Sequence, residues 1–295
     1  MKIAILILLH EYTVQQKMLV NQLSSDFDVF VHIDKKSTVG VKDVEQDTVF
    51  AFKEYKVYWG SFTQILATLF LFEKAYTYNK SGGGYNRYIL ISGADIPLKT
   101  NREIMRFFEN NTVEYFEYHK LPKPQWSRQN GGFDRMDFYH FNYERRKKRL
   151  SINKLLNAAN ERIVIPMLRF LHIKRKRFCS EYFGGANWMD LTNSCVSQIL
   201  DFLKHTPDYV KSFKFTRCAD EIFFHTIIMN YVSGVTVENN SLRYIDWHTG
   251  PEFPRTLRTE DYASMKESGM LFARKFDLKT DSDIIYRLYS DIEEG

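Results

Sequence analysis

Two short and almost uninterrupted apolar runs constrain the fold of this chain more than any other feature. One run spans residues 3–9 and the other, RYILIS, spans residues 87–92. Strands that are buried on both faces have this composition, and they belong to parallel sheets that helices cover. Both runs alternate with stretches of helical apolar spacing, of which residues 61–78 are the clearest. The pattern predicts an α/β fold with a mostly parallel central sheet flanked by helices.

Shorter patterns predict the remaining elements. Pro166 has no N–H to donate, so we expect it to kink the amphipathic helix predicted over 152–172. The other predicted helices cover 12–24 and 193–205 and begin near 219 and 281, and the other predicted strands cover 28–34, 48–52, 56–58, 114–119 and 243–246.

Polar residues follow three of the predicted strands. His10 follows the first strand, Asp34 ends the strand over 28–34, and Asp95 lies in the loop after RYILIS. Open α/β sheets bind their ligands beyond the carboxyl ends of the strands. We therefore expect His10, Asp34 and Asp95 to gather in one crevice at that edge of the sheet.

The segment LFARKFD, residues 271–277, places two cations side by side, Arg274 and Lys275. Neighbouring cations repel each other, so this arrangement favours an anion nearby. The alternative is that Lys275 is a solvated surface residue. The flanking Phe272 and Phe276 favour a packed setting instead.

The segment CADEIFFHTI, residues 218–227, carries Glu221 at the expected start of a helix, beside Asp220. Apolar neighbours and an adjacent acid are expected to raise the pKa of Glu221, as suits a general base. The alternative is a pair of ordinary N-terminal acids that the helix dipole favours, and the motif alone favours this alternative.

Four segments occur in one order along the chain: VHIDKKS (31–37), ISGADIPLKT (91–100), CADEIFFHTI and LFARKFD. With them the chain resembles the core-2/I-branching N-acetylglucosaminyltransferase and xylosyltransferase family, glycosyltransferase family 14, from residue 3 to about 290. The resemblance implies a GT-A-like glycosyltransferase fold and an inverting transfer of a sugar from a UDP-sugar. It also implies that side chains, without a metal, hold the donor diphosphate.

The resemblance implies roles for the residues of the last two segments. Glu221 corresponds to the family's catalytic base, although Ala219 stands where the family has proline. Lys275 and Arg255, the latter in GPEFPRTL, correspond to the Lys and Arg that contact the diphosphate. Arg258 lies close by in the sequence and competes with Arg255 for that role.

The resemblance assigns further donor contacts near the strand ends. Asp34 corresponds to the acid that contacts the nucleoside, with His10 beside it, and Trp59 corresponds to an aromatic residue near the nucleotide. Asp95 is expected to shape the donor site. The alternative is that Asp95 and Lys99 only stabilise a turn.

Three further residues are expected to bind the acceptor. Glu117 resembles the family's acid that binds acceptor hydroxyl groups, and Arg135 resembles its matching cation. Trp247 resembles an aromatic wall of the sugar site, although a tryptophan packed in the core is an equally good interpretation.

Two D-x-D pairs test for a metal site, because many sugar-nucleotide transferases hold Mn²⁺ or Mg²⁺ with such a pair. Asp26 and Asp28 precede the second strand, and Asp281 and Asp283 open the last helix. Neither pair lies at the expected strand end. We expect both to be structural, and we expect the transfer to need no metal and no cofactor.

The resulting hypothesis is a single glycosyltransferase domain over 1–295, with a nucleotide-sugar-binding half (1–110) and an acceptor-binding and catalytic half (111–295). The expected reaction moves N-acetylglucosamine from its UDP-sugar to a hydroxyl of a glycan or lipid-linked glycan, in bacterial surface polysaccharide synthesis. UDP-xylose, UDP-glucuronate and other UDP-sugars remain open as donors. The alternative outside enzymes is a basic protein on a transferase scaffold that binds membranes or nucleic acid.

Residues 143–178 hold 12 Lys and Arg and 2 Asp and Glu, a net charge of +10, whereas the rest of the chain has 29 and 34, a net charge of −5. Basic residues flank the predicted amphipathic helix there, which favours peripheral contact with an anionic membrane surface. The alternative is a helix packed on the domain with a solvated basic rim. Nucleic-acid binding is the weakest interpretation, because no nucleic-acid-binding motif accompanies the charge.

The location is predicted from two negative signals. The apolar run at the N-terminus is far shorter than the ~20 residues of a spanning helix and has no small-residue cleavage site. The three cysteines have neither metal spacing nor an even number for disulfides. Eukaryotic relatives are membrane-anchored and rich in disulfides, so we expect a bacterial, cytoplasmic member, in peripheral contact with the inner membrane face.

Overall fold

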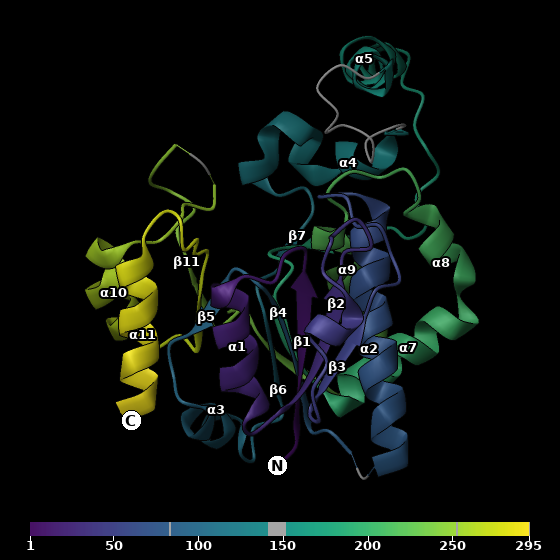
Figure 1. The fold of residues 1–295 in the computed structure, drawn as a ribbon. Coiled ribbons are helices and arrows are strands. Elements are labelled where there is room, and N and C mark those ends of the chain that lie inside the picture. Colours follow the sequence, from purple (N-terminus) through teal and green to yellow (C-terminus); the bar gives the residue numbers. More distant parts are fainter. Residues whose placement is uncertain (83, 141–151, 252, 295) are drawn as a thin grey trace.

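A computed structural model describes residues 1–82, 84–140, 152–251 and 253–294. Its central element is a seven-stranded sheet with helices on both faces (Figure 1). The strand order is β10-β6-β9-β4-β1-β2-β3, and β9 alone runs antiparallel to its neighbours. The prediction of a mostly parallel α/β sheet is therefore confirmed. The strands are β1 (Ile3–Leu9), β2 (Asp28–Ile33), β3 (Val49–Phe52), β4 (Arg87–Ser92), β6 (Val113–Phe116), β9 (Met189–Thr192) and β10 (Thr236–Glu238).

Successive side chains of β1 enter two different cores, which explains why its run is continuously apolar. Ala4 and Leu6 face the core under α2 (Phe62–Gly82), α7 (Asn193–His205) and α9 (Asp220–Tyr231). Ile5 and Ile7 face the core under α1 (Val14–Ser24) and α3 (Asn101–Phe108). A strand between two helix layers has no solvent face on which a polar residue would be stable.

A second, three-stranded sheet has the order β11-β12-β5. It joins Asp95–Pro97 (β5) to two segments from the end of the chain, Arg243–Ile245 (β11) and Phe272–Arg274 (β12). Helices α10 (Tyr262–Glu267) and α11 (Ser282–Glu294) lie beside it (Figure 1) and share its apolar core. This sheet brings the LFARKFD segment to the loop that follows β4.

The described residues between β6 and β9 lie above the carboxyl edge of the central sheet (Figure 1). It contains the two-stranded ribbon of β7 and β8 and the short helices that carry the basic segment. The remaining elements are β7 (His119–Lys120), β8 (Phe183–Gly184), α4 (Asp134–Asp137), α5 (Ile152–Ala159), a π-helical turn (Asn160–Val164), α6 (Ile165–Phe170), α8 (Pro207–Ser212) and the 3₁₀ turns Val41–Asp43, Pro124–Gly132 and Thr259–Asp261.

Three predicted elements differ from the structure. No strand forms over 56–58; instead the amide of Val57 donates to the side chain of Asp34 at 3.1 Å. The strand predicted over 114–119 is interrupted, because both backbone groups of Tyr118 bond to the side chain of Asn239. The helix predicted over 152–172 is divided by the π-helical turn that precedes Pro166.

Within the ranges that the structure describes, none of the helices combines the length and the apolar composition required to traverse a lipid bilayer.

Candidate functional site

The carboxyl ends of the three central strands meet, as predicted. The amide of Asp34, just after β2, donates to the carbonyl of Leu9 at 2.7 Å, and the amide of Gly93, just after β4, donates to the carbonyl of Leu8 at 3.1 Å. His10 follows β1 at the same edge; its side chain is 78% exposed, and a carboxylate oxygen of Glu11 lies 3.8 Å from its ring. The edge is therefore formed by backbone contacts, and His10 stands at its rim.

Asp34 connects the end of β2 to the loop that carries Trp59. Its Oδ1 accepts hydrogen bonds from the amides of Lys36 (2.9 Å) and Val57 (3.1 Å), and its Oδ2 pairs with the ammonium group of Lys36 at 2.7 Å. Asp34 is buried, whereas Trp59, two residues beyond Val57, is 69% exposed. The hydrogen bond from Val57 therefore joins Asp34 to the loop that carries Trp59, and the two predicted donor residues lie on neighbouring segments.

A backbone hydrogen bond joins this loop to the segment that contains Glu221. The amide of Cys218 donates to the carbonyl of Gly60 at 2.6 Å. The carbonyl of Cys218 in turn accepts a hydrogen bond from Arg135 at 3.1 Å. The donor side and the proposed base are therefore linked through Cys218, although they lie far apart in the sequence.

Glu221 lies in the first turn of α9 and pairs with Arg135 of α4. The distance between Arg135 Nη1 and Glu221 Oε2 is 2.5 Å. The side chain of Arg135 is 8% exposed and that of Glu221 is 28% exposed, so the carboxylate is accessible while its partner is covered. Arg135 also stacks on Trp126, with 3.7 Å between its guanidinium carbon and the ring centroid. The structure thus brings together the predicted base and a predicted acceptor residue.

The acid beside Glu221 has the strongly apolar environment. Asp220 is 5% exposed, and its Oδ1 has no hydrogen-bond partner among the described residues. Burial, with the neighbouring charge of Glu221, raises the pKa of Asp220 to about 7. The apolar environment that the sequence predicts for Glu221 is found at Asp220 instead. Glu221 itself faces the guanidinium group of Arg135.

Two adjacent glycines, Gly184 and Gly185, pack closely against the backbones of Glu117, a predicted acceptor residue, and Glu221, the predicted base. The amide of Gly185 donates to the carbonyl of Glu221 at 2.9 Å. A Cβ on Gly185 would lie 1.8 Å from the carbonyl oxygen of Glu117, and a Cβ on Gly184 would lie 2.9 Å from that of Glu221. Such distances exclude any side chain at either position, so only glycine allows the two backbone segments to pack this closely.

Lys123 lies within electrostatic reach of both Glu117 and Glu221. Burial lowers the pKa of Lys123, whereas the charges of Glu117 and Glu221 raise it. Its ammonium group also lies 5.1 Å from the ring centroid of Trp126. Two carboxylates, two cations and an aromatic ring therefore form one cluster, the base cluster: Glu117, Lys123, Trp126, Arg135 and Glu221.

The anion beside the LFARKFD cations is the protein's own Asp95. Arg274 Nε lies 3.8 Å from Asp95 Oδ1, in register across the β12–β5 pair. Asp95 is fully buried and also accepts hydrogen bonds from the amide (2.9 Å) and hydroxyl (2.5 Å) of Ser92. Arg274 stacks on Trp188 at 3.8 Å. A carboxylate of the protein itself therefore lies beside Arg274, and the hydrogen bonds from Ser92 hold Asp95 within the turn.

Lys275, next in the chain, is half-buried and touches the segment of Arg255. Its carbonyl accepts a hydrogen bond from the amide of Leu257 at 2.9 Å. The guanidinium group of Arg255 pairs with Asp246, at 2.8 Å, and with Asp261. Hydrogen bonds to Asp261, which has the largest effect, and to Asp246 raise the pKa of Arg255. Both predicted diphosphate contacts therefore lie on neighbouring segments, and Arg255 already has Asp246, Asp261 and, at 4.0 Å, Glu260 as carboxylate partners.

Trp247 and Arg258 flank the Arg255 pairs. Trp247 follows Asp246 directly and is 41% exposed, so it is not a core residue. Arg258 is exposed, and within the described ranges its guanidinium group makes no ion pair. The two candidates for the diphosphate contact therefore differ: the guanidinium group of Arg255 is paired with carboxylates, whereas that of Arg258 is exposed.

Both D-x-D pairs have structural contacts. Asp28 opens β2 and accepts a hydrogen bond from the Tyr85 hydroxyl at 2.5 Å. Asp281 accepts from the amides of Asp283 (3.0 Å) and Ile284 (3.2 Å) at the start of α11. In the parts of the chain that the structure describes, no three His, Cys, Asp or Glu side chains are grouped as metal ligands would be.

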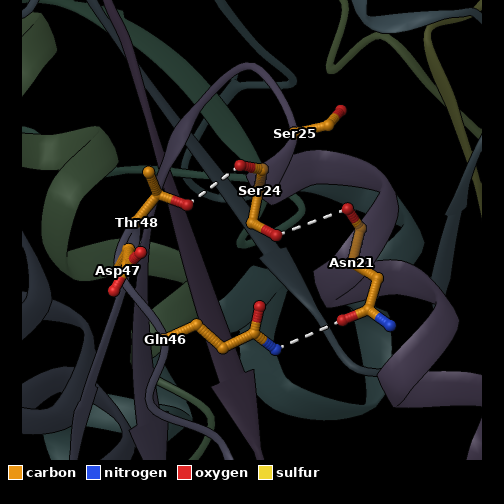
Figure 2. A pocket seen from close by; sticks show the side chains of 6 residues that line it. All are labelled: Asn21, Ser24, Ser25, Gln46, Asp47 and Thr48. Carbon is orange, nitrogen blue, oxygen red and sulfur yellow. Dashed lines mark hydrogen bonds between the residues drawn. The ribbon is translucent and has the colours of Figure 1, made fainter.

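A surface hollow of about 410 Å³ lies away from these residues (Figure 2). Ser24, which ends α1, accepts a hydrogen bond from the hydroxyl of Thr48, which precedes β3, at 2.9 Å. Both positions mark the amino ends of the strands, opposite the edge with Asp34. The hollow is lined by small polar side chains and includes none of the predicted site residues.

The sequence prediction missed Lys123 and Trp126 of the base cluster and the glycine pair, Gly184 and Gly185, that packs against it. The adjacent Gly184 and Gly185 were a usable signal, because paired glycines outside a turn often mark a close approach of two backbones. Lys123 and Trp126 carried no such signal. They lie in an irregular polar loop, where the sequence gives no spacing to interpret.

Comparisons with known proteins give a family and two relatives. The family model described as "Branch: Core-2/I-Branching enzyme" matches residues 3–268. Beta-glucuronosyltransferase GlcAT14B of Arabidopsis thaliana is 24% identical over 228 residues, which cover 73% of this chain and 48% of the relative. Xylosyltransferase 2 of Pan troglodytes is 22% identical over an alignment of 328 residues, which covers 100% of this chain and 34% of the relative. The chain thus spans less than half the length of these curated relatives.

Proposed function

Because this chain belongs to the Core-2/I-branching enzyme family, a family of glycosyltransferases, we propose that it moves a sugar from a UDP-sugar to a hydroxyl group of a glycan. The observation that carries the proposal is the pair of Glu221 and Arg135, which leaves an accessible carboxylate on a fixed support. The α/β sheet is consistent with the GT-A-like fold expected of this family.

Glu221 acts as the general base of an inverting transfer. It takes the proton of the acceptor hydroxyl while that oxygen forms a bond to the anomeric carbon. The bond from the anomeric carbon to the diphosphate oxygen breaks on the opposite face, and UDP leaves with the electron pair. Arg135 fixes the direction of the carboxylate, because its own position is fixed by Trp126 and by the carbonyl of Cys218.

Cations of the protein stabilise the departing diphosphate in place of a metal. Lys275 and Arg255 are the proposed contacts, on neighbouring segments joined by the Leu257–Lys275 hydrogen bond. A diphosphate that reaches Arg255 replaces or joins Asp246 and Asp261, and a guanidinium group has enough donors to serve more than one anion. Arg258 is the alternative contact, since it is exposed and needs no exchange of partners.

The nucleoside binds at the carboxyl edge of the sheet. His10, Asp34 and Trp59 are the proposed contacts there, and Asp95 shapes this side of the site through Arg274. N-acetylglucosamine is the proposed sugar. The names of the two relatives make glucuronate and xylose the first alternatives.

The acceptor binds beside the base cluster. Glu117 accepts hydrogen bonds from its hydroxyl groups, Arg135 supports Glu221, and Trp247, as an exposed aromatic residue, supplies a face for a sugar ring. A glycan or lipid-linked glycan of a bacterial surface polysaccharide is the proposed acceptor.

UDP release from a panel of UDP-sugars, measured with a glycan acceptor and EDTA, tests the proposal. The proposal expects one donor to be turned over at the same rate with EDTA and with added Mn²⁺. Turnover that requires Mn²⁺ would contradict the metal-free role of Arg255 and Lys275. Absence of UDP binding, measured by calorimetry, would instead favour the alternative of a binding protein on a transferase scaffold.

A further inference from the structure

The helical segment formed by α5, the π-helical turn and α6 has its apolar side chains on the outside. The exposed fraction is 72% for Leu155, 65% for Ile163 and 83% for Phe170. Met167 and Leu171 are each 52% exposed. Single exposed apolar residues are ordinary, but a continuous apolar face on a surface helix marks an interaction site.

The exposed and covered residues of this segment alternate with helical spacing. Ile163, Met167 and Phe170 are separated by four and three positions, so they share one face. Ile165 and Leu168 lie on the opposite face, where Ile165 is buried and Leu168 is half-buried. The apolar face therefore points directly away from the body of the protein.

Polar contacts join the buried Ile165 in attaching this segment to the body. Glu161 pairs with Arg217 at 3.0 Å and with His140 at 2.7 Å. Asn160 donates to the carbonyl of Tyr139 at 2.8 Å. An ordinary surface helix has the reverse arrangement, with its apolar stripe inward. The segment therefore contacts the domain, whereas the side chains of Ile163, Met167 and Phe170 stay exposed.

Cations surround the apolar face. Arg162 and Lys176 are exposed and make no ion pair with any residue that the structure describes. Five consecutive cations, RRKKR (145–149), precede the segment in the sequence, and KRKR (174–177) follows it. The sequence 145–149 lies outside the described residues, so only its charge enters the argument. An apolar helical face bounded by cations complements the surface of an anionic lipid bilayer.

We infer that residues 155–176 form an interfacial segment that attaches the protein to an anionic lipid bilayer. Leu155, Ile163, Met167, Phe170 and Leu171 enter the bilayer surface, and Arg162 and Lys176 contact lipid phosphates. The α5 end of this segment lies at the top of Figure 1, apart from the central sheet. Attachment therefore leaves the sheet and its bound substrates outside the lipid.

Co-sedimentation of the full chain with vesicles tests this inference without sugar transfer. We expect binding to vesicles of phosphatidylcholine with phosphatidylglycerol, and weak or no binding to phosphatidylcholine alone. The triple change Ile163→Ser, Met167→Ser and Phe170→Ser should abolish the binding, because each buried apolar side chain contributes about tenfold. Tyr286→Ser, at an exposed position of α11, is the matched control and should bind like the wild type.

A second pair of variants tests the charges. Arg162→Gln with Lys176→Gln should weaken binding by about fivefold for each cation, and more salt should remove this difference. Lys204→Gln with Lys279→Gln removes the same charge elsewhere and should leave binding unchanged. All these positions are exposed, so thermal unfolding should match that of the wild type.

Three results would overturn the inference. Wild-type protein that stays in the supernatant with phosphatidylglycerol vesicles at low salt would exclude attachment. Equal binding to both kinds of vesicle would exclude the role of the cations. A dimer that the triple change dissociates, with no vesicle binding, would show that a second copy of the chain covers this face.

Discussion

Glu221 of α9 and Arg135 of α4 form an ion pair with 2.5 Å between Nη1 and Oε2, across a sequence separation of 86 residues. Arg135 is the less exposed partner and is also held by Trp126 and by the carbonyl of Cys218. The guanidinium group is therefore a fixed support for an accessible carboxylate. This relationship connects the predicted acceptor site to the predicted base.

Arg135→Lys should lower kcat by about 100-fold, because a flexible ammonium group cannot stack on Trp126 and hold Glu221 and Cys218 together. The KM for the UDP-sugar should stay near the wild-type value, since Arg135 does not contact the donor in this account. Steady-state kinetics with each substrate varied in turn would check both statements. A raised donor KM with unchanged kcat would contradict the assigned role.

Asp220 should make stability depend on pH. Its pKa is raised to about 7 in the folded protein, so between about pH 4 and about pH 7 the folded state holds a proton that the unfolded chain has released. The stabilisation is fully present below that range and is lost as the pH rises through about 7. The free energy of unfolding should therefore fall across this range by about 2–4 kcal/mol more in the wild type than in Asp220→Asn.

Urea unfolding of both proteins at several pH values measures this difference. Titrating groups that do not face Asp220 are common to both proteins, so their contributions cancel in the comparison; Glu221, whose charge acts on Asp220, is the exception. Parallel curves for the wild type and Asp220→Asn would show that Asp220 is not protonated in the folded protein.

The central sheet was predictable because its strands carry their own signal. The runs at β1 and β4 are apolar on both faces, and only a strand between two helix layers needs this composition. The three-stranded sheet was not predicted, because β5 and β12 are three residues each and pair only across a long sequence separation. Such short strands depend on tertiary contacts more than on local pattern.

The candidate site was predicted in part for the same reason. Glu221, Asp34 and Lys275 lie in short motifs, and the chain places each motif at the end of a regular element. The partners of these residues were not predictable. The fold brings distant segments together, and this places Arg135 against Glu221 and Asp95 beside Arg274. The apolar face of residues 155–171 showed helical spacing in the sequence, but spacing does not tell which face points outward.

Arg255 and Arg258 can be separated by matched substitutions. If Arg255 binds the diphosphate, Arg255→Gln should lower kcat/KM for the donor by about 100-fold or more, as expected for loss of a charge-assisted contact to a leaving group. Arg258→Gln should then change kcat/KM by less than about threefold. The reverse order of the two effects would assign the contact to Arg258. Thermal unfolding of Arg255→Gln must accompany the kinetics, because Asp246 and Asp261 lose their partner.

The central claim is that Glu221 removes the proton from the acceptor hydroxyl. The most direct measurement is the rate of sugar transfer by Glu221→Gln, which keeps the size and hydrogen bonding of the side chain but removes the base. Glu267→Gln, at an exposed position of α10, is the control. The account predicts that Glu221→Gln folds, still binds UDP and loses about 100- to 10,000-fold in transfer rate. A folded Glu221→Gln that transfers sugar within about threefold of the wild-type rate would contradict it, since loss of a general base costs far more than that.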